Sequence, residues 1–361
     1  MSHADRIERL RARFADKDLD SFLVTSPENR AYFSGFRGTA GYLWITPRDT
    51  LLATDSRYTE QAEAQARDYT IVRITSGLDW IDEAVAASSA RRIGIEDGDM
   101  SVSMFNTLKE RFGKRDPVPE LIPTGSMATQ LRAIKEPSEL AVMQRAIDLA
   151  DGAMEAVGAR LHPGMTERDV AWDMERTMRE LGADGLSFET IVASGPNGAK
   201  AHHHPTDRKL EVGDGIVVDM GALYDGYCSD ITRTFVLGEA SEQFRKVYDT
   251  VLAAQETAAA TARAGMTGSE VDALARAVIV DAGYGDSFGH SLGHGIGIAV
   301  HELPGVGPKS DGPIEDGMVF SIEPGIYLTG WGGVRIEDLV LMENGKPRVL
   351  THAHKRDLVA V

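Results

Sequence analysis

Hydrophobic residues recur with two different periods along the first third of the chain. Ile7, Leu10 and Phe14 have helical spacing and predict a first amphipathic helix. Short apolar runs then lie between turn-forming residues and are typical of strands: FLVTS, YLWIT, TLLAT and, later, RIGIED. The polar run RYTEQAEAQARDY among them predicts a helix. Because strands and helices alternate, we expect an α/β layer domain.

Three prolines and a glycine interrupt this pattern in residues 116–126, DPVPELIPTGS, which we interpret as a linker. A chain of 361 residues also exceeds what one hydrophobic core usually supports. We therefore expect two domains, residues 1–126 and residues 127–361.

Helical spacing dominates the beginning of the second domain. Ser138, which follows a proline, occupies a capping position and predicts the start of a long helix. Two further helices are expected near residues 166–181 and 241–264. Gly-Met-Thr turns that end at Thr166 and Thr267 precede helix starts in the same way, which indicates an internal repeat.

Acidic residues interrupt an apolar pattern in residues 215–235, GIVVDMGALYDGYCSDITRTF. The β-forming residues on either side of Asp225 predict two strands around a turn. If these strands pair as a hairpin, Asp219 and Asp230 are cross-strand neighbours to within one register step.

Residues 318–342 repeat this arrangement, with Glu323 and Glu337 on either side of a glycine-rich turn centred on Gly330. A third segment, GHGIG, contains His294, and its glycines allow a close approach of the backbone. We expect the two hairpins and this segment to meet at one centre.

Four carboxylates and one imidazole suit a dinuclear metal site. Buried carboxylates need partners or a metal, and two ions close together can activate water for hydrolysis. The proposed ligands are Asp219, Asp230, His294, Glu323 and Glu337. Oxygen-rich ligation with one imidazole suits manganese, and zinc or cobalt would also bind.

Composition narrows the class of protein further. The 38 Lys and Arg against 55 Asp and Glu give a formal net charge of −17, which disfavours binding to nucleic acid or to an anionic membrane. Cys228 is the single cysteine, so an internal disulfide is excluded. No apolar run is long enough for a membrane span, and the charged N-terminus lacks the apolar core of a signal peptide. We expect a cytoplasmic protein.

The ordered motifs resemble those of the pita-bread metallopeptidases, the group of methionine aminopeptidase, aminopeptidase P and prolidase. The resemblance covers residues 128–361 and is closest to the proline-specific branch. It is carried by SFETIVASGPNGAKAHHHPTDRKLEVGDGIVVDMGALYDGYCSDITRTF and by FGHSLGHGIGIAVHELPGV. Further upstream, SFLVTSPENRAYFSGFRGTAGYLWIT and TDSRY resemble the smaller domain of prolidase, aminopeptidase P and creatinase. The implied fold is α/β (α+β), a pita-bread catalytic domain with a creatinase-like N-terminal α/β domain.

The resemblance also implies roles for residues outside the ligand set. His202 and His301 match histidines that contact the substrate, and Glu323 would act as the base as well as a metal ligand. Arg335 would orient the ligand carboxylates, and Phe188 matches a residue that lines the proline pocket.

Three other histidines fall outside this match. His203 and His204 are then expected to be rim or loop residues, and His290 a structural or outer-shell residue.

The implied activity is metal-dependent hydrolysis of the Xaa-Pro bond at the N-terminus of peptides, of the Xaa-Pro dipeptidase (prolidase) type. An aminopeptidase P that acts on longer Xaa-Pro peptides is the alternative, because some prolidases carry an arginine where this chain has Gly305. A methionine aminopeptidase would lack the N-terminal domain, and a creatinase would lack the metal ligands. From another class, a catalytically inactive binding module is the remaining alternative. The family usually forms homodimers, and we expect one here.

Overall fold

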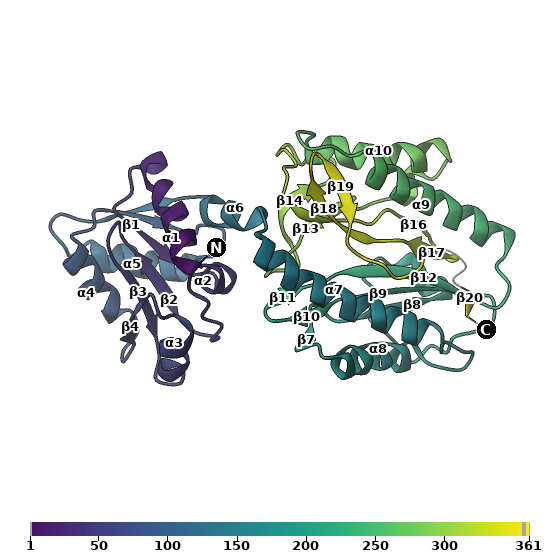
Figure 1. The fold of residues 1–361 in the computed structure, drawn as a ribbon, viewed down its shortest axis with the longest axis horizontal. Coiled ribbons are helices and arrows are strands. Elements are labelled where there is room, and N and C mark those ends of the chain that lie inside the picture. Colours follow the sequence, from purple (N-terminus) through teal and green to yellow (C-terminus); the bar gives the residue numbers. More distant parts are fainter. Residues whose placement is uncertain (1, 356–358, 361) are drawn as a thin grey trace. The chain divides into compact units, whose positions relative to one another are not determined.

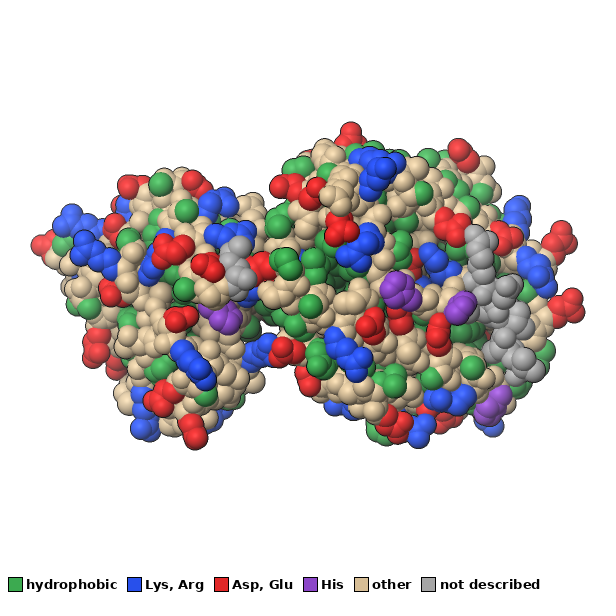
Figure 2. Space-filling model, in the orientation of Figure 1, with side chains coloured by type: hydrophobic (Ala, Val, Ile, Leu, Met, Phe, Trp, Pro, Cys, Tyr) green, Lys and Arg blue, Asp and Glu red, His purple; other side chains and the backbone are tan. Residues whose placement is uncertain are grey.

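The computed structural model describes residues 2–355 and 359–360, and the chain divides into two compact units, Met1–Arg132 and Ala133–Val361 (Figure 1). The unit boundary thus lies at residues 132/133, against 126/127 in the sequence-based expectation. Figure 2 shows acidic side chains spread over the visible face of each unit with basic ones interspersed. Among the described residues, no helix is both long and apolar enough to cross a membrane.

The N-terminal unit is built on a six-stranded mixed sheet in the order β4-β3-β2-β1-β5-β6. Its strands are β1 (Ser21–Val24), β2 (Tyr42–Ile45), β3 (Thr50–Thr54), β4 (Thr70–Arg73), β5 (Arg92–Ile95) and β6 (Glu120–Pro123). Its helices are α1 (His3–Ala12), α2 (Pro27–Ser34), α3 (Thr59–Gln65), α4 (Asp79–Ser88), α5 (Val102–Phe112) and α6 (Met127–Ala133). The strands and helices alternate, as the sequence pattern predicts.

The interpretation of residues 116–126 as a linker is wrong in part. Residues 120–123 form β6, which pairs in parallel with β5 at the edge of the sheet. An edge strand tolerates proline, because one of its backbone N–H groups can lie outside the ladder. The prolines therefore mark an edge strand here, and the chain leaves the N-terminal unit only after α6 begins.

The C-terminal unit contains two main sheets, β20-β12-β9-β8 and β14-β13-β15-β18-β19. The first consists of β8 (Ile191–Ser194), β9 (Gly215–Met220), β12 (Ile231–Leu237) and β20 (Val359–Ala360). The second consists of β13 (Gly293–Gly295), β14 (Glu302–Val306), β15 (Val319–Ile322), β18 (Asp338–Glu343) and β19 (Lys346–Val349). A three-stranded sheet joins β7 (Gly185–Leu186), β10 (Ala222–Tyr224) and β11 (Tyr227–Cys228), and β16 (Gly325–Leu328) pairs with β17 (Gly332–Arg335).

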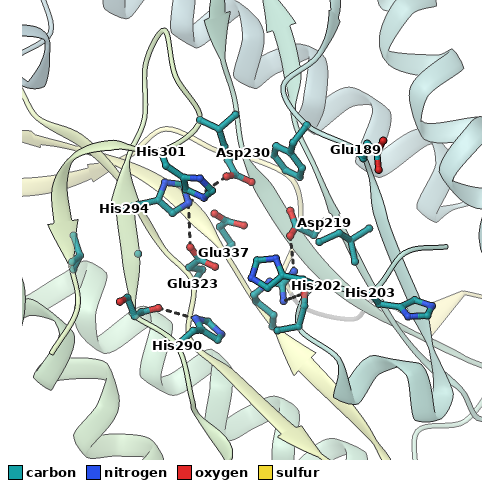
Figure 3. Close-up of a pocket in the computed structure, with 18 of the residues that line it drawn as sticks. Glu189, His202, His203, Asp219, Asp230, His290, His294, His301, Glu323 and Glu337 are labelled. Atoms are coloured by element: carbon teal, nitrogen blue, oxygen red, sulfur yellow. Dashed lines mark hydrogen bonds and ion pairs between the residues drawn. The ribbon is translucent and has the colours of Figure 1, made fainter. Parts of the chain in front are cut away.

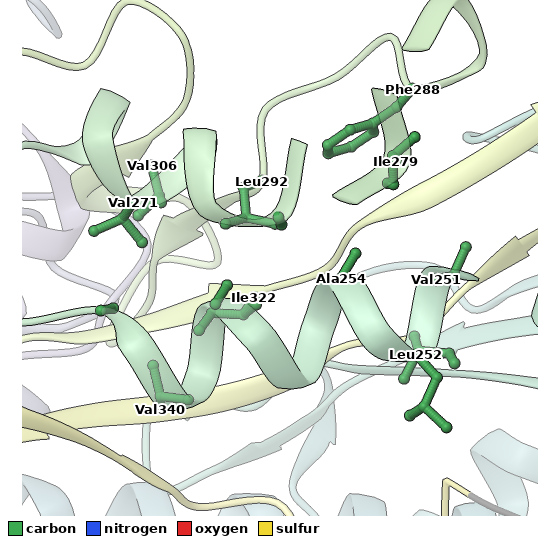
Figure 4. Close-up of a cluster of buried hydrophobic side chains, with 14 of the residues drawn as sticks. Val251, Leu252, Ala254, Val271, Ile279, Phe288, Leu292, Val306, Ile322 and Val340 are labelled. Carbon is green, nitrogen blue, oxygen red and sulfur yellow. The ribbon is translucent and has the colours of Figure 1, made fainter. Parts of the chain in front are cut away.

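A pair of helices covers each main sheet. Helices α7 (Pro137–Gly158) and α8 (Glu167–Leu181) share a hydrophobic core with β8, β9 and β12. Helices α9 (Glu242–Thr261) and α10 (Gly268–Asp281) share another with β15 and β18 (Figure 4). Figure 1 shows α9 and α10 on one side of the unit and α8 on the other.

The predicted cap of the first long helix is displaced by two residues. Glu136 is the N-cap of α7, Pro137 is its first residue, and Glu139 completes a capping box with Glu136. Proline suits the first helical position, because the N–H it lacks has no partner there in any case. Ser138 therefore lies inside the helix.

The two halves of the unit repeat one local structure, as the Gly-Met-Thr turns predict. Gly164 and Gly265 both have positive φ, 93° and 91°, and the threonines that follow cap α8 and α10. Thr166 then bridges to Lys209, and Thr267 bridges to Pro313. Each half therefore contributes a helix pair and a sheet of its own to the C-terminal unit.

Both predicted hairpins form. Strand β9 pairs antiparallel with β12, and Asp219 is the register partner of Thr232. Asp230, just before β12, lies two residues from that partner, so the expected offset of at most one register step is exceeded by one residue. Asp225 and Gly226 both have positive φ and make the turn. Strand β16 pairs antiparallel with β17 around a turn that contains Gly330.

Candidate metal centre

A cavity of about 830 Å³ opens between the two sheets of the C-terminal unit (Figure 3). All five proposed ligands line it, and so do the other residues singled out by the resemblance: Phe188, His202, His301 and Arg335. Segments that lie more than a hundred residues apart in the chain are thus brought to one place, as the hairpin argument requires.

Asp219 projects from β9 and is held by Arg335, the last residue of β17. An Arg335 guanidinium nitrogen lies 2.5 Å from Asp219 Oδ2. Arg335 Nε also donates to Thr232 Oγ1 at 3.1 Å, and Thr232 Oγ1 donates to Glu337 Oε2 at 2.7 Å. Arg335 therefore fixes one carboxylate directly and a second through a hydroxyl, which matches the supporting role that metal ligands need.

His294 approaches from β13 on the opposite sheet. Its Nε2 lies 3.6 Å from Asp230 Oδ2 and 3.4 Å from Glu323 Oε1. Its Nδ1 lies 3.1 Å from the carbonyl oxygen of Gly295, so we assign the proton to Nδ1. That assignment leaves the Nε2 lone pair facing the carboxylates.

Glycines on either side of His294 permit this approach. An added Cβ at Gly293 would collide with the carbonyl oxygen of Ser321, and one at Gly295 with that of Leu303. Strand β13 therefore lies closer to its neighbours than any side chain would allow, as expected for the GHGIG segment.

The close packing of the acidic groups shifts their pKa values. Burial, together with the neighbouring carboxylates, raises the pKa of Asp230 and of Glu337 well above their usual ranges. Burial also raises the pKa of Glu323 to about 7. Burial and the neighbouring His301 lower the pKa of His294 to about 4, so this imidazole is neutral at pH 7.

The residues present fit divalent cations. Among the described residues that line the cavity, four carboxylates share the site with one guanidinium, that of Arg335. Buried oxygens of two of them, Asp219 Oδ1 and Glu337 Oε1, accept no hydrogen bond. Ligand atoms of Asp230, His294 and Glu337 lie within 4.8 Å of one another. Orphaned carboxylate oxygens beside a neutral imidazole are a donor set for a metal.

His202 and His301 face the cavity from its two sides (Figure 3). His202 lies in the loop between the 3₁₀ helix η2 (Gly195–Ala199) and β9, and its side chain is exposed. The His301 ring packs edge-on against His294, with ring centroids 4.2 Å apart. Phe188 is half-buried on the cavity wall, so it is not a plain core aromatic.

His203 lies in a loop and lines the cavity, as a rim or loop residue would, but it is not exposed. His203 is buried, and its Nε2 lies 2.9 Å from Glu167 Oε2. His204 does lie at the surface, with 86% of its side chain exposed. The three consecutive histidines therefore have three different environments, which no pattern of neighbouring residues predicts.

His290 lies on the cavity wall rather than outside it. Its Nδ1 lies 2.8 Å from the Ser291 carbonyl oxygen, and its Nε2 lies 2.9 Å from the Tyr327 hydroxyl. Tyr327 also accepts from Arg335 at 2.8 Å. Tyr327 was not predicted from the sequence, although its place in the second hairpin, shortly after Glu323, was an available signal.

Two family patterns match the chain. Metallopeptidase family M24 matches residues 141–344, and the creatinase/prolidase N-terminal domain matches residues 6–134. An Xaa-Pro dipeptidase of Pyrococcus furiosus is 38% identical over 348 residues, which span 96% of this chain and 97% of the relative.

Solved structures agree over nearly the whole chain. An Xaa-Pro dipeptidase from Bacillus anthracis is similar with a TM-score of 0.95 and 39% identity, over 99% of this chain and 100% of that one. An X-Pro aminopeptidase from Thermotoga maritima is similar with a TM-score of 0.91 and 37% identity, over 98% and 99% of the two chains. The expected fold class is confirmed: a mixed α/β chain with a creatinase-like N-terminal domain and a pita-bread catalytic domain.

Proposed function

The chain belongs to metallopeptidase family M24, and on that premise we propose that it hydrolyses the bond between an N-terminal residue and a following proline. The observation that carries the proposal is the convergence of four carboxylates and the His294 imidazole in a cavity that His202 and His301 also line. The named relatives are Xaa-Pro dipeptidases and an X-Pro aminopeptidase, which supports the same bond specificity.

We propose that the cofactor is a pair of divalent ions held by the five predicted ligands. The orphaned oxygens of Asp219 and Glu337 support this assignment. Bound there, the ions would supply Lewis-acid polarisation of the scissile carbonyl and a lowered pKa for the attacking water. Manganese suits the oxygen-rich donor set, and zinc or cobalt would fit the same side chains.

The chain's own groups supply the proton transfers. Glu323, whose carboxylate also accepts from Ser321 Oγ at 3.1 Å, would take a proton from the water and deliver it to the proline nitrogen. His202 and His301 would donate hydrogen bonds to the oxygen on which negative charge develops.

Selectivity for proline would come from the shape of the cavity. The Xaa-Pro bond is a tertiary amide without an N–H, so a site for it needs no acceptor at that position. Phe188 offers an apolar surface on the cavity wall, against which a pyrrolidine ring can pack. Loss of the ring removes about three methylenes at ~0.8 kcal/mol each, so packing alone discriminates by roughly 10²-fold.

A second candidate function differs only in substrate length. A dipeptide presents a carboxylate directly after its proline, and a cation would be needed to bind it. Position 305 is glycine, and Arg335, the arginine in the cavity wall, is already bonded to Asp219 and Tyr327. This observation favours longer Xaa-Pro peptides, the substrates of an aminopeptidase P.

Peptide hydrolysis tests both proposals. With added Mn²⁺, kcat/KM for Met-Pro should exceed that for Met-Ala roughly 10²-fold, and chelation should abolish both activities. Equal values for the two dipeptides would overturn the proline specificity. Cleavage of Met-Pro but not Met-Pro-Ala would identify a dipeptidase, whereas the reverse would identify an aminopeptidase and give weight to Gly305.

A further inference from the structure

A buried carboxylate outside the ligand set lies behind the loop that carries His202. Glu167 is the first residue of α8, and its side chain is fully buried. Burial by itself would raise the pKa of this carboxyl, but hydrogen bonds to it, foremost from the Thr206 side chain, lower the pKa to about 2. Glu167 is therefore ionised at neutral pH, and its position at a helix N-terminus favours the charge.

Both oxygens of Glu167 are saturated by donors from the loop. Oε1 accepts from the Ser194 N–H and hydroxyl, both at 2.8 Å, and from Asn197 Nδ2 at 3.0 Å. Oε2 accepts from the Thr206 N–H at 3.0 Å, from its hydroxyl at 2.6 Å and from His203 Nε2 at 2.9 Å. One carboxylate thus ties together the beginning and the end of the segment 194–206.

The residues around His202 are pinned from the other side as well. Arg335 donates to the carbonyl oxygen of Ala201 at 3.2 Å. At Gly198 the backbone packs so closely on β17 that an added Cβ would lie 2.9 Å from the nitrogen of Gly333. His202 therefore lies between Ala201, held by Arg335, and His203, held by Glu167.

We propose that Glu167 is a positioning residue, which holds this loop so that the His202 ring projects into the cavity. The inference rests on the proposed role of His202 in peptide hydrolysis. Glu167 is not among the described residues that line the cavity, so it acts through the loop and not on the substrate.

Glu167→Gln tests the proposal. The glutamine amide keeps one acceptor oxygen, but its NH₂ group faces hydrogen-bond donors of the loop and cannot accept from them. We measure kcat/KM for an Xaa-Pro peptide with the wild type, Glu167→Gln, His202→Ala and the double variant. Glu167→Gln should lower kcat/KM about tenfold or more, while adding it to His202→Ala should lower the value by no more than about twofold. Losses that multiply in the double variant, or wild-type activity of Glu167→Gln, would contradict the proposal.

Asp169→Asn is the matched control in the same turn of α8. Asp169 completes the capping box with Thr166 and does not contact the histidine loop. Its loss weakens the start of α8, and we expect kcat/KM to stay within about twofold of the wild type. If Glu167→Gln fails to fold, Thr206→Val, which removes one of the six donors, enters the same cycle with an expected loss of about threefold.

Hydrogen exchange of the metal-free proteins gives a readout that does not depend on activity. Amides in residues 194–206 should exchange faster in Glu167→Gln than in the wild type, and at the wild-type rate in Asp169→Asn. Unchanged protection of this segment in Glu167→Gln would overturn the positioning role. A wild type that cleaves no Xaa-Pro peptide would instead overturn the proposed function, and the exchange result would still decide whether Glu167 holds the loop.

Discussion

Single oxygen atoms decide the metal assignment at the residue scale. Asp219 and Glu337 each keep one buried oxygen without a hydrogen bond, while the other oxygen is bound by Arg335 or Thr232. The protein therefore orients both carboxylates and leaves one acceptor of each for a ligand from outside the chain. Such an acceptor is costly to bury unless a cation occupies the site.

Asp219→Ala or Glu337→Ala should therefore bind one ion fewer than the wild type and lose turnover by orders of magnitude, with the fold retained. Metal analysis by mass spectrometry and circular dichroism measure the two effects. Glu343→Ala, which removes an exposed carboxylate paired with Arg348, serves as the control and should keep full metal content. Two ions per chain in either of the two site variants would contradict the ligand assignment.

The histidine substitutions should differ in their effect on turnover according to what each side chain contacts. His202→Ala and His301→Ala should keep both metal ions and lose roughly 10²–10³-fold in kcat, because each removes a donor to the developing charge. His203→Ala should cost less than His202→Ala, since the buried His203 ring is held by Glu167 through its Nε2. His204→Ala, at the exposed end of the run, should behave as the wild type. A larger loss for His203→Ala than for His202→Ala would show that the wrong histidine was assigned to the substrate.

The sequence predicts those parts of the site that depend on contacts between neighbouring segments of the chain. The carboxylate pairs of each hairpin depend on a turn between adjacent strands, and hydrophobic alternation with Gly226 or Gly330 reveals such turns. The contacts of Glu167 with His203 and Thr206 join segments that are far apart in the chain. No periodicity encodes those contacts, so the buried state of His203 could not be read from the sequence.

At the scale of elements, the close packing of β13 on its neighbours controls the position of His294. Gly293→Ala would place a methyl group against the Ser321 carbonyl oxygen, so the strand must shift. Overpacking of this kind costs about 1–3 kcal/mol, and displacement of His294 should weaken metal binding about tenfold or more. Titration of the metal-free protein with Mn²⁺ measures the change. Gly289→Ala, where an added Cβ meets open space, should bind as the wild type does.

The α/β fold was predictable at the element scale because short sequence motifs mark the start of a helix in each half of the catalytic unit. Thr166 and Thr267 both cap helices shortly after a glycine of positive φ, so the Gly-Met-Thr motif alone predicts the repeat. The linker at residues 116–126 was misjudged for a related reason. Prolines signal an interruption, but they do not distinguish a loop from an edge strand such as β6.

For the whole molecule, the crowded carboxylates link stability to pH. The pKa of Glu323 is raised from 4.5 to about 7, so between these values the folded, metal-free protein binds protons that the unfolded chain does not. Stability should therefore fall as pH rises through this window, by up to about 1.4 kcal/mol per pH unit for one such group. Asp230 and Glu337 shift in the same direction.

Thermal unfolding of the metal-free protein from pH 5 to pH 7 measures this slope. Saturating Mn²⁺ requires deprotonated ligands, so it should remove the decline or reverse it. Glu323→Gln carries no proton that titrates and should show a shallower slope than the wild type without metal. A metal-free wild type whose stability rises steadily over the same range would contradict the linkage.

The ligands come from both halves of the catalytic unit, β9 and the residue before β12 on one side and β13 and the second hairpin on the other. Ions bound between them would fasten the halves much as a disulfide fastens two strands, closing a loop of about 100 residues. The metal would then determine the resistance of the protein to proteolysis as well as its catalysis. We expect chelated enzyme to be digested by a nonspecific protease many times faster than the loaded form, so a cell short of the metal would lose the protein itself.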